Sequence, residues 1–275
     1  MSEVVPSWPR VLLRRDWVLA LLASVVFAVA AWFLGQWQWH RYEARHERAQ
    51  LVQAHYDAPP VPVTEVVGDA PLDPSREWTT VMATGRYDTA RTIFVRNRPL
   101  EGTYGYEVLV PLRTADGVVL VDRGWVPNSD EGAAVLPDVP EPPPGEVTVT
   151  GWLRRAESEP SEPLPRPQLG TIDLDAAAHL AGGPVLGGYI VLDEERAGGV
   201  PTPPERRPAR LAEPTTGTGP HLFYAFQWWA AMPIGFVLVA LGVRRQVADA
   251  RWRAEGHEGP RERPRKVRIW DEEDA

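Results

Sequence analysis

The residue with the clearest chemical potential is His221, which stands at the start of an apolar segment rich in aromatic side chains. The rings that follow it within nine positions are Phe223, Tyr224, Phe226, Trp228 and Trp229. An imidazole can coordinate an iron atom while aromatic rings line the apolar side of the site. The alternative is an interfacial histidine that only anchors the helix.

A second group, His40 and Arg41, directly follows another apolar segment that ends in tryptophans. Arg41 shares a helix face with Trp37, four positions earlier. Its planar guanidinium can bind a carboxylate bidentately, either on a ligand or in an acidic patch of a partner. The alternative is a side chain that snorkels toward the membrane surface. The remaining histidines of the central region are expected to be solvated: His46, His55 and His179.

The charged residues of the central region favour structural roles. Asp122 and Arg123 alternate with apolar neighbours, which predicts a cross-strand pair, and Gly124 permits a bulge or a close backbone approach. The segment Arg96-Asn97-Arg98 is typical of a turn with solvated charges.

Catalytic motifs are missing from the sequence. The chain has no cysteine, which excludes thiolate catalysis and cysteine-ligated metal centres. It has no zinc-protease, phosphate-loop or serine-hydrolase motif. Carboxylates are plentiful, but no pair stands in an apolar strand context that would separate the two pKa values. We therefore expect that the protein is not an enzyme.

The charge distribution argues against a nucleic-acid partner. The net charge is -8, and residues 40–220 combine 17 arginines with 27 acidic residues. Such an acidic surface repels phosphate backbones.

Two apolar segments are long enough to cross a lipid bilayer, and we place them at residues 17–39 and 221–243. Tryptophans at their ends resemble an aromatic belt. For the first segment the alternative is a cleaved signal peptide, because arginines precede it and Ala28-Val29-Ala30 resembles a cleavage site. For the second it is the core helix of a soluble protein. Pro233 and Gly235 predict a kink in the second span.

Arginines flank both segments at the ends nearer to the chain termini. The positive-inside rule therefore places residues 1–16 and 244–275 in the cytoplasm and the central region outside it. We expect a bacterial inner-membrane protein whose tail, 244–275, is largely disordered. Because the two spans are antiparallel, His40 and His221 lie at the same membrane surface, where a bis-histidine site is geometrically possible.

The region between the spans, 40–220, is predicted to form one domain. Residues 40–56 favour a helical stalk, 78–192 a β-rich core, and 198–220 a proline-rich linker. Strands are predicted at 78–87, 91–97, 106–112, 117–126, 146–153 and 188–193, and a short helix capped by Asp173 or Asp175 at 176–181. The fold class is therefore α+β, with two transmembrane helices flanking an antiparallel sheet or small barrel.

Four motifs resemble the surfeit locus protein 1 family of cytochrome c oxidase assembly factors. LGQWQWHR at 34–41 resembles the family's LGxWQxxR, and VRNRP at 95–99 with GYEVLVPL at 105–112 resembles its central strands. GVVLVDRGWVP at 117–127 is similar to LVxRGWVP, and HLFYAFQWW at 221–229 to HLxYAxQW. The resemblance runs from about Leu34 to Val243.

The resemblance implies a non-enzymatic role in building the haem a-containing subunit I of the oxidase, by receiving or holding haem a, with haem a synthase as a further partner. Such a protein needs an iron ligand, an apolar wall and cations. We assign these roles to His221, the expected iron ligand, and to Tyr224, Trp228, Trp229, Trp37, Arg41 and His40. The motif leaves position 40 variable. Two alternatives are a membrane-tethered scaffold that contacts oxidase subunits without haem, and an unrelated extracytoplasmic binding module.

Overall fold

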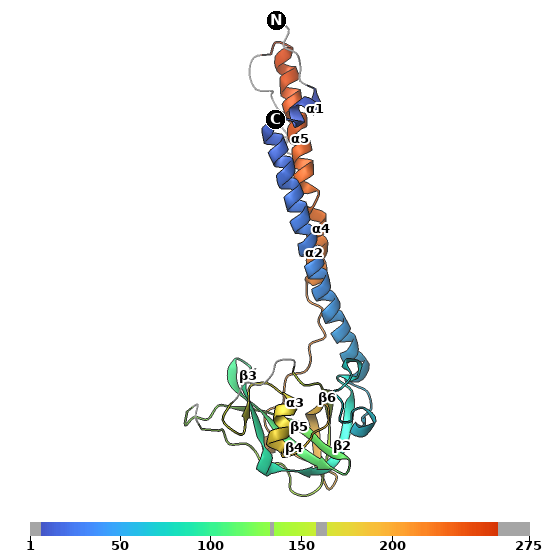
Figure 1. Ribbon diagram of the computed structural model, residues 1–275, viewed down its shortest axis with the longest axis vertical. Helices are drawn as coiled ribbons and strands as arrows, with labels where there is room; N and C mark the ends of the chain where they lie inside the picture. The colour runs from blue at the N-terminus through green and yellow to red at the C-terminus, as the bar shows by residue number, and fades with distance from the viewer. Residues whose placement is uncertain (1–6, 133–134, 158–163, 258–275) are drawn as a thin grey trace, which may run out of the picture. The chain divides into compact units, whose positions relative to one another are not determined.

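The computed structural model describes residues 7–132, 135–157 and 164–257, which fall into two compact units (Figure 1). One unit comprises Met1–Ala44 and Thr218–Ala275 and is helical, whereas the other, Arg45–Gly217, is rich in β-structure. The predictions for residues 1–6 and 258–275 lie outside the described residues.

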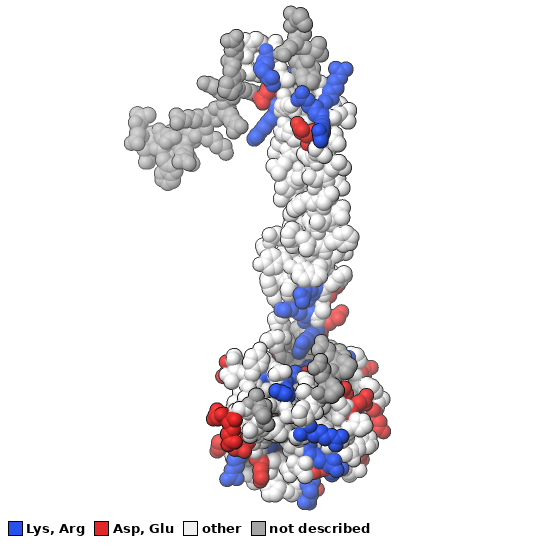
Figure 2. Space-filling model, turned by 60° about the vertical axis from the view of Figure 1, so that its left-hand side comes forward, with Lys and Arg blue, Asp and Glu red and all other residues white. Residues whose placement is uncertain are grey.

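The helical unit contains α1 (Trp8–Leu12), most of α2 (Arg15–His55), α4 (His221–Ala231) and α5 (Ile234–Ala254). Helix α2, and α4 together with α5, are long and apolar enough to cross a membrane. Their apolar side chains mostly face outward: Val26, Phe33 and Leu238 are 69%, 66% and 62% exposed. Figure 2 shows an uncharged band along these helices, with basic and acidic side chains beyond each end of the band. These are not the core helices of a soluble protein.

The second span is interrupted where Pro233 predicted a kink. Helix α4 ends at Ala231 and α5 begins at Ile234, because proline lacks the amide hydrogen that would continue the helix. Helix α5 then continues to Ala254, which corrects the expectation of disorder from Arg244 onward. The sequence there is rich in Ala and Arg, and Arg251 and Arg253 in the last turn suit the negative end of the helix dipole.

Three glycines set how closely the two antiparallel helical segments approach. A Cβ atom added to any of them would overlap a side chain of the opposite helix, in the pairs Gly35 with Trp229, Gly235 with Ser24, and Gly242 with Trp17. Small residues allow this backbone approach in helices that have no hydrophobic driving force between them. Beside the last pair, the Trp17 indole N–H donates to Gln246 Oε1 at 2.5 Å.

The second unit is built on a small barrel. Among the described residues its strands are β1 (Val61–Pro62), β2 (Thr80–Tyr87), β3 (Ile93–Leu100), β4 (Thr103–Thr114), β5 (Gly117–Pro127), β6 (Val147–Arg154), β7 (Gln168–Leu169), β8 (Tyr189–Ala197) and β9 (Val200–Pro201). The ring closes in the order β2-β6-β8-β5-β4 and back to β2. All six predicted strands are present. The sheet is not purely antiparallel, because β5 and β8 pair in parallel.

The barrel strands bury both faces. Val108, Val110 and Leu112 of β4 contribute to the barrel interior, whereas Leu109 between them packs on the outside. Successive side chains of a strand point to opposite faces, so this near-continuous apolar run serves two clusters.

Helix α3 (Leu174–Ala181) belongs to the outer cluster through Ala177 and Ala181. Its N-cap is Asp173, as one of the two predicted alternatives, and the carboxylate accepts the backbone N–H groups of Asp175 and Ala176. The helix ends at Gly182, whose φ of 78° suits glycine.

The last turns of α2 confirm the predicted helical stalk and pack within the β-rich unit. Val52 is buried with Trp78 and Trp152, and the Tyr56 ring stacks on Trp152 at a centroid distance of 4.2 Å. Arg154 lies over the Trp78 ring at 4.2 Å. Aromatic stacking and cation-π contacts thus fix the end of the stalk.

The segment predicted as a linker, 198–220, is partly folded onto the barrel. Strand β9 pairs with β8, and Ala209 bridges to Trp125 through hydrogen bonds of 2.8 Å in both directions. Gly124, with φ of 124°, lets Ala209 approach, which confirms the predicted close backbone approach at this glycine.

Candidate functional site

The predicted site residues, at the end of the first apolar segment and the start of the second, lie on α2 and α4 within the helical unit. On α2 the face toward α4 carries Ala31, Gly35 and Gln38, at helical spacings of four and three. On α4 the matching face carries His221, Ala225 and Trp229, each four positions apart. Ala31 and Ala225 are fully buried, so the seam between these faces is closely packed.

A hydrogen bond across this seam joins two of the motifs. His221 Nδ1 lies 2.8 Å from Gln38 Oε1, although the residues are 183 positions apart in the sequence. His221 is half-buried, and no described residue forms a hydrogen bond with its other ring nitrogen, Nε2. The imidazole is therefore held at one nitrogen and open at the other.

Aromatic rings surround the seam next to this histidine. The Trp229 ring lies 6.2 Å from Trp32, 6.0 Å from Trp39 and 5.7 Å from Phe226, measured between centroids. The indole Nε1 of Trp229 is buried and has no hydrogen-bond partner among the described residues. A buried indole N–H normally finds a partner, but this one packs against Gly35 of α2 and lies inside the packed seam.

The other predicted residues present an outer apolar and cationic surface. Tyr224 and Trp37 are 42% and 52% exposed, and Trp228 is half-buried. The Arg41 guanidinium lies 5.1 Å from the centre of the Trp37 ring, as their spacing predicted. His40 is exposed, and the structure pairs His221 with Gln38 rather than with His40.

Gln38 is the residue of the candidate site that the sequence interpretation missed. It is the glutamine of the LGxWQxxR motif, and this was the signal that could have found it. Elsewhere, His55 was expected to be solvated but is half-buried, with Nδ1 3.1 Å from the carbonyl oxygen of Glu77. Among the described residues, no group of three or more His, Asp or Glu side chains could hold a metal ion.

The barrel contains a fully buried ion pair, Arg123 with Glu195. The guanidinium donates to both carboxylate oxygens, at 2.8 and 3.2 Å, and to the Pro140 carbonyl at 2.8 Å. The Tyr87 hydroxyl donates to the same carboxylate at 3.0 Å, and burial raises the pKa of Tyr87 well above its ordinary value. Arg123 thus forms the predicted structural cross-strand pair, with Glu195 as its partner, and it joins β5 to β8.

A second polar cluster corrects the prediction that Arg96, Asn97 and Arg98 are a solvated turn. Asn97, with φ of 58°, stands in a β-bulge of β3. This directs Arg98 onto two carboxylates, Glu107 at 3.1 Å and Glu157 at 2.7 Å. Asparagine tolerates the left-handed conformation that the bulge requires.

The sequence led us to expect no pair of carboxylates in an apolar strand context. The structure corrects this expectation, because Asp122 is buried and Glu107 half-buried on the adjacent strands β5 and β4. Burial raises the pKa of Asp122 well above its ordinary value, and the Glu107 carboxylate nearby raises it further. Burial likewise raises the pKa of Glu107, against the opposing effect of Arg98. Asp122 Oδ1 accepts the Gly124 amide, and Oδ2 is buried without a partner among the described residues. With 1% of its surface exposed, Asp122 is closed to substrates and acts on stability.

Together these features define a class: a protein with a small β-barrel domain, and a pair of membrane-length helices that share a histidine, a glutamine and an aromatic wall. Residues 25–232 match the model of the SURF1 family, and the chain belongs to this family. It is 31% identical over 269 residues to uncharacterized SURF1-like proteins of Mycobacterium tuberculosis and Mycobacterium bovis, covering 93% of each chain. A SURF1-like protein of Dictyostelium discoideum is 26% identical over 119 residues, 41% of this chain and 44% of that protein.

Replacing Asp122 by Asn is expected to flatten the dependence of stability on pH. Between the unfolded and the raised folded pKa, the folded state binds more protons, so the free energy of unfolding falls as pH rises. Asparagine cannot ionise and still offers Oδ1 to Gly124, so D122N should gain stability over the parent as pH rises above the unfolded pKa of about 4. Some slope remains, because the pKa of Glu107 is also raised.

The measurement is denaturant unfolding of the full chain in detergent, followed by tryptophan fluorescence at several pH values. D116N, at an exposed turn between β4 and β5, is the matched control and should keep the parent slope. Equal slopes in D122N and the parent would show that Asp122 is ionised in the folded protein.

Proposed function

We propose that this protein is a membrane-anchored assembly factor of haem-copper cytochrome oxidase that receives or holds haem a for subunit I. Membership of the SURF1 family implies a role in cytochrome oxidase assembly, and the family's members are assembly factors rather than enzymes. The finer proposal, direct handling of haem a, is supported by one observation: His221 is held at Nδ1 and open at Nε2 beside an aromatic wall.

The residues at this site have the chemistry that binding of haem a requires. His221 would offer Nε2 to the haem iron, and the exposed rings of Tyr224 and Trp37 with Trp228 would contact the apolar macrocycle and its tail. Trp229 would contribute through the aromatic wall, because its indole N–H is buried against Gly35. Arg41 would pair with a propionate through its planar fork. When bound, the haem supplies the redox-active iron centre that the oxidase subunit requires.

The partners follow from this role. Subunit I would accept the haem, haem a synthase is a possible donor, and the lipid bilayer holds the two apolar helical segments. A scaffold that contacts oxidase subunits without touching haem would need the same anchors, so the experiment below is designed to separate the two roles.

We further propose that both termini lie in the cytoplasm and the barrel outside it, because Arg10, Arg14, Arg244 and Arg245 flank the apolar segments. A reporter active only outside the cytoplasm should be active when fused after Pro140 and silent after Ala275. A cytoplasmic reporter at the same two points is the control and should give the opposite pattern. Activity of the external reporter after Ala275 alone would reverse the orientation.

His221→Ala is expected to lower the content of haem a-containing oxidase in a deletion strain, compared with the parent gene supplied at equal level. Purified in detergent from cells that make haem a, the parent should carry haem a, and H221A should lose its spectrum or show a shifted one. The fold should survive, because His221 is half-buried at the first position of α4 and removes little packed volume.

H179A, an exposed histidine of the barrel unit, is the control and should behave as the parent. H40A tests a second axial ligand: losses equal to those of H221A, and not additive with them, would indicate a bis-histidine site. If the parent supports oxidase assembly yet carries no haem, or H221A binds haem a with an unchanged spectrum, the scaffold role replaces haem handling.

A further inference from the structure

The hydrogen bond between Gln38 and His221 has a chemical direction. An amide carbonyl oxygen can only accept, so His221 Nδ1 must carry the hydrogen and donate it over the 2.8 Å to Gln38 Oε1. A neutral imidazole has one hydrogen, which leaves the lone pair on Nε2. The partner of one ring nitrogen thus decides which nitrogen can bind a metal.

The packing below this bond keeps the two side chains in register. Gly35 lies three positions before Gln38, and Trp229 lies two turns after His221 on the same face of α4. Because Gly35 has no side chain, the Trp229 indole sits against its backbone. The fully buried Ala225 lies between His221 and Trp229.

We propose that Gln38 is the positioning residue of His221: it selects the Nδ1-protonated tautomer and fixes the ring, so that Nε2 faces a ligand as a lone-pair donor. This inference rests on the proposed function, in which that ligand is haem iron. The tautomer itself is a property of the protein without haem and can be measured separately.

The first measurement is nitrogen NMR of the haem-free full chain in detergent, with labelled histidine in alkaline buffer and the His221 signals assigned by their loss in H221A. The parent should show the Nδ1-protonated form, and Gln38→Ala should shift the population toward Nε2 protonation. Gln36→Ala is the matched control: the same residue type two positions away, without the bond to His221. An Nε2-protonated parent, or Q38A identical to the parent, overturns the proposal.

The second measurement is haem a binding by the same variants. Q38A should bind about 10- to 100-fold more weakly, the usual effect of removing a partner of a metal-binding histidine. Gln38→Glu keeps an acceptor, so it should retain binding and lower the reduction potential of the bound haem. If the parent shows the predicted tautomer but binds no haem, the positioning role stands and the proposed function fails. If haem binds through His221 equally well in Q38A, the positioning role fails alone.

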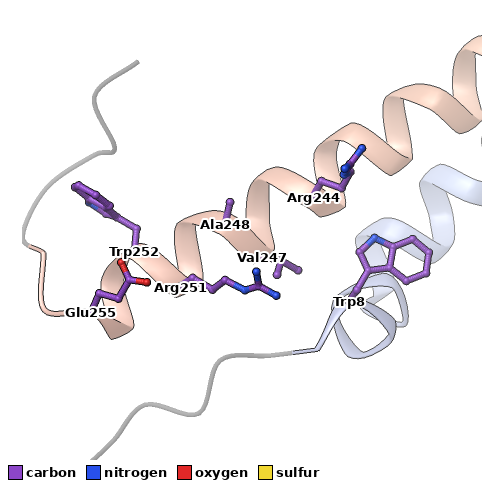
Figure 3. Close-up of a pocket in the computed structure, with 7 residues that line it drawn as sticks. All are labelled: Trp8, Arg244, Val247, Ala248, Arg251, Trp252 and Glu255. Carbon is purple, nitrogen blue, oxygen red and sulfur yellow. The ribbon is translucent and has the colours of Figure 1, made fainter. Parts of the chain in front are cut away.

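A separate observation concerns a hollow of about 540 Å³ between α1 and the end of α5 (Figure 3). Trp8, Arg244, Val247, Arg251, Trp252 and Glu255 line it. Arg244 and Arg251 are seven positions apart and so lie on one side of the helix. In Figure 3 the Arg251 side chain extends along α5 in the direction of Trp8. Neither arginine forms an ion pair with any described residue, so their charges are open to a ligand.

The depth of this hollow relative to the apolar segment indicates its occupant. The predicted span ends at Val243, and a helix rises 1.5 Å per residue, which places Val247 about 6 Å beyond that end and the backbone of Arg251 about 12 Å beyond it. The headgroup layer of a bilayer occupies roughly the first 5 to 8 Å outside the hydrocarbon. Val247 lies at this depth, and the Arg251 side chain extends back toward Trp8 from farther out (Figure 3). Tryptophan is typical of membrane interfaces, and arginine forks bind phosphate.

We infer that the hollow binds the phosphate headgroup of an anionic phospholipid in the leaflet nearest the two termini. The experiment is native mass spectrometry of the full chain in detergent with phosphatidylglycerol, phosphatidylcholine or glycerol 3-phosphate. Phosphatidylglycerol should bind, and the double variant R244Q/R251Q should weaken it at least about tenfold.

The matched control is R245Q/R253Q, which removes the same charge from the same turns of α5 but from side chains that do not line the hollow. It should change binding by less than about threefold. Equal losses in both double variants would show a general surface attraction without a site. Equal binding of phosphatidylcholine, or of glycerol 3-phosphate, would overturn the assignment to an anionic lipid.

Discussion

The arrangement of the helical unit depends on close backbone contact at three glycines. Gly35, Gly235 and Gly242 each receive a large or polar side chain of the opposite helix, so the two apolar segments can lie together in one register only. A shift of one residue along this seam would turn Gln38 away from His221, because successive helix positions differ by about 100°. Site geometry therefore follows from van der Waals fit at residues with no chemistry of their own.

The barrel applies a different constraint, the cost of burying charge. Arg123 and Glu195 have no exposed surface, yet both carboxylate oxygens and all three guanidinium nitrogens have partners. Removing one member of such a pair costs about 3–5 kcal/mol, because the other charge is left uncompensated. This pair crosses the one parallel contact of the ring, β5 with β8, where no hairpin enforces the pairing. The charges therefore specify the junction that chain connectivity leaves open.

Local chemistry explains which parts of the fold could be predicted from the sequence. Alternating β-branched residues identified all six long strands, Asp173 was one of two predicted caps of α3, and Pro233 marked the break between α4 and α5. The two-residue strands β1, β7 and β9 carry no pattern of their own, since they exist only through pairing with a longer strand. The burial of Asp122, Glu107 and Glu195 depends on barrel closure, and no local signal in the sequence records it.

The candidate site divides in the same way. His221, Arg41 and the aromatic residues were predictable because each has a recognisable chemistry beside an apolar segment. Gln38 was not, since an amide has no distinctive chemistry until its partner is known, and that partner is 183 positions away. His40 shows the converse: it has a suitable imidazole directly after the apolar segment, yet it lies outside the face formed by Ala31, Gly35 and Gln38. The direction in which each side chain points is set by the helix contacts at the three glycines. That direction decides which of several chemically suitable residues can act together.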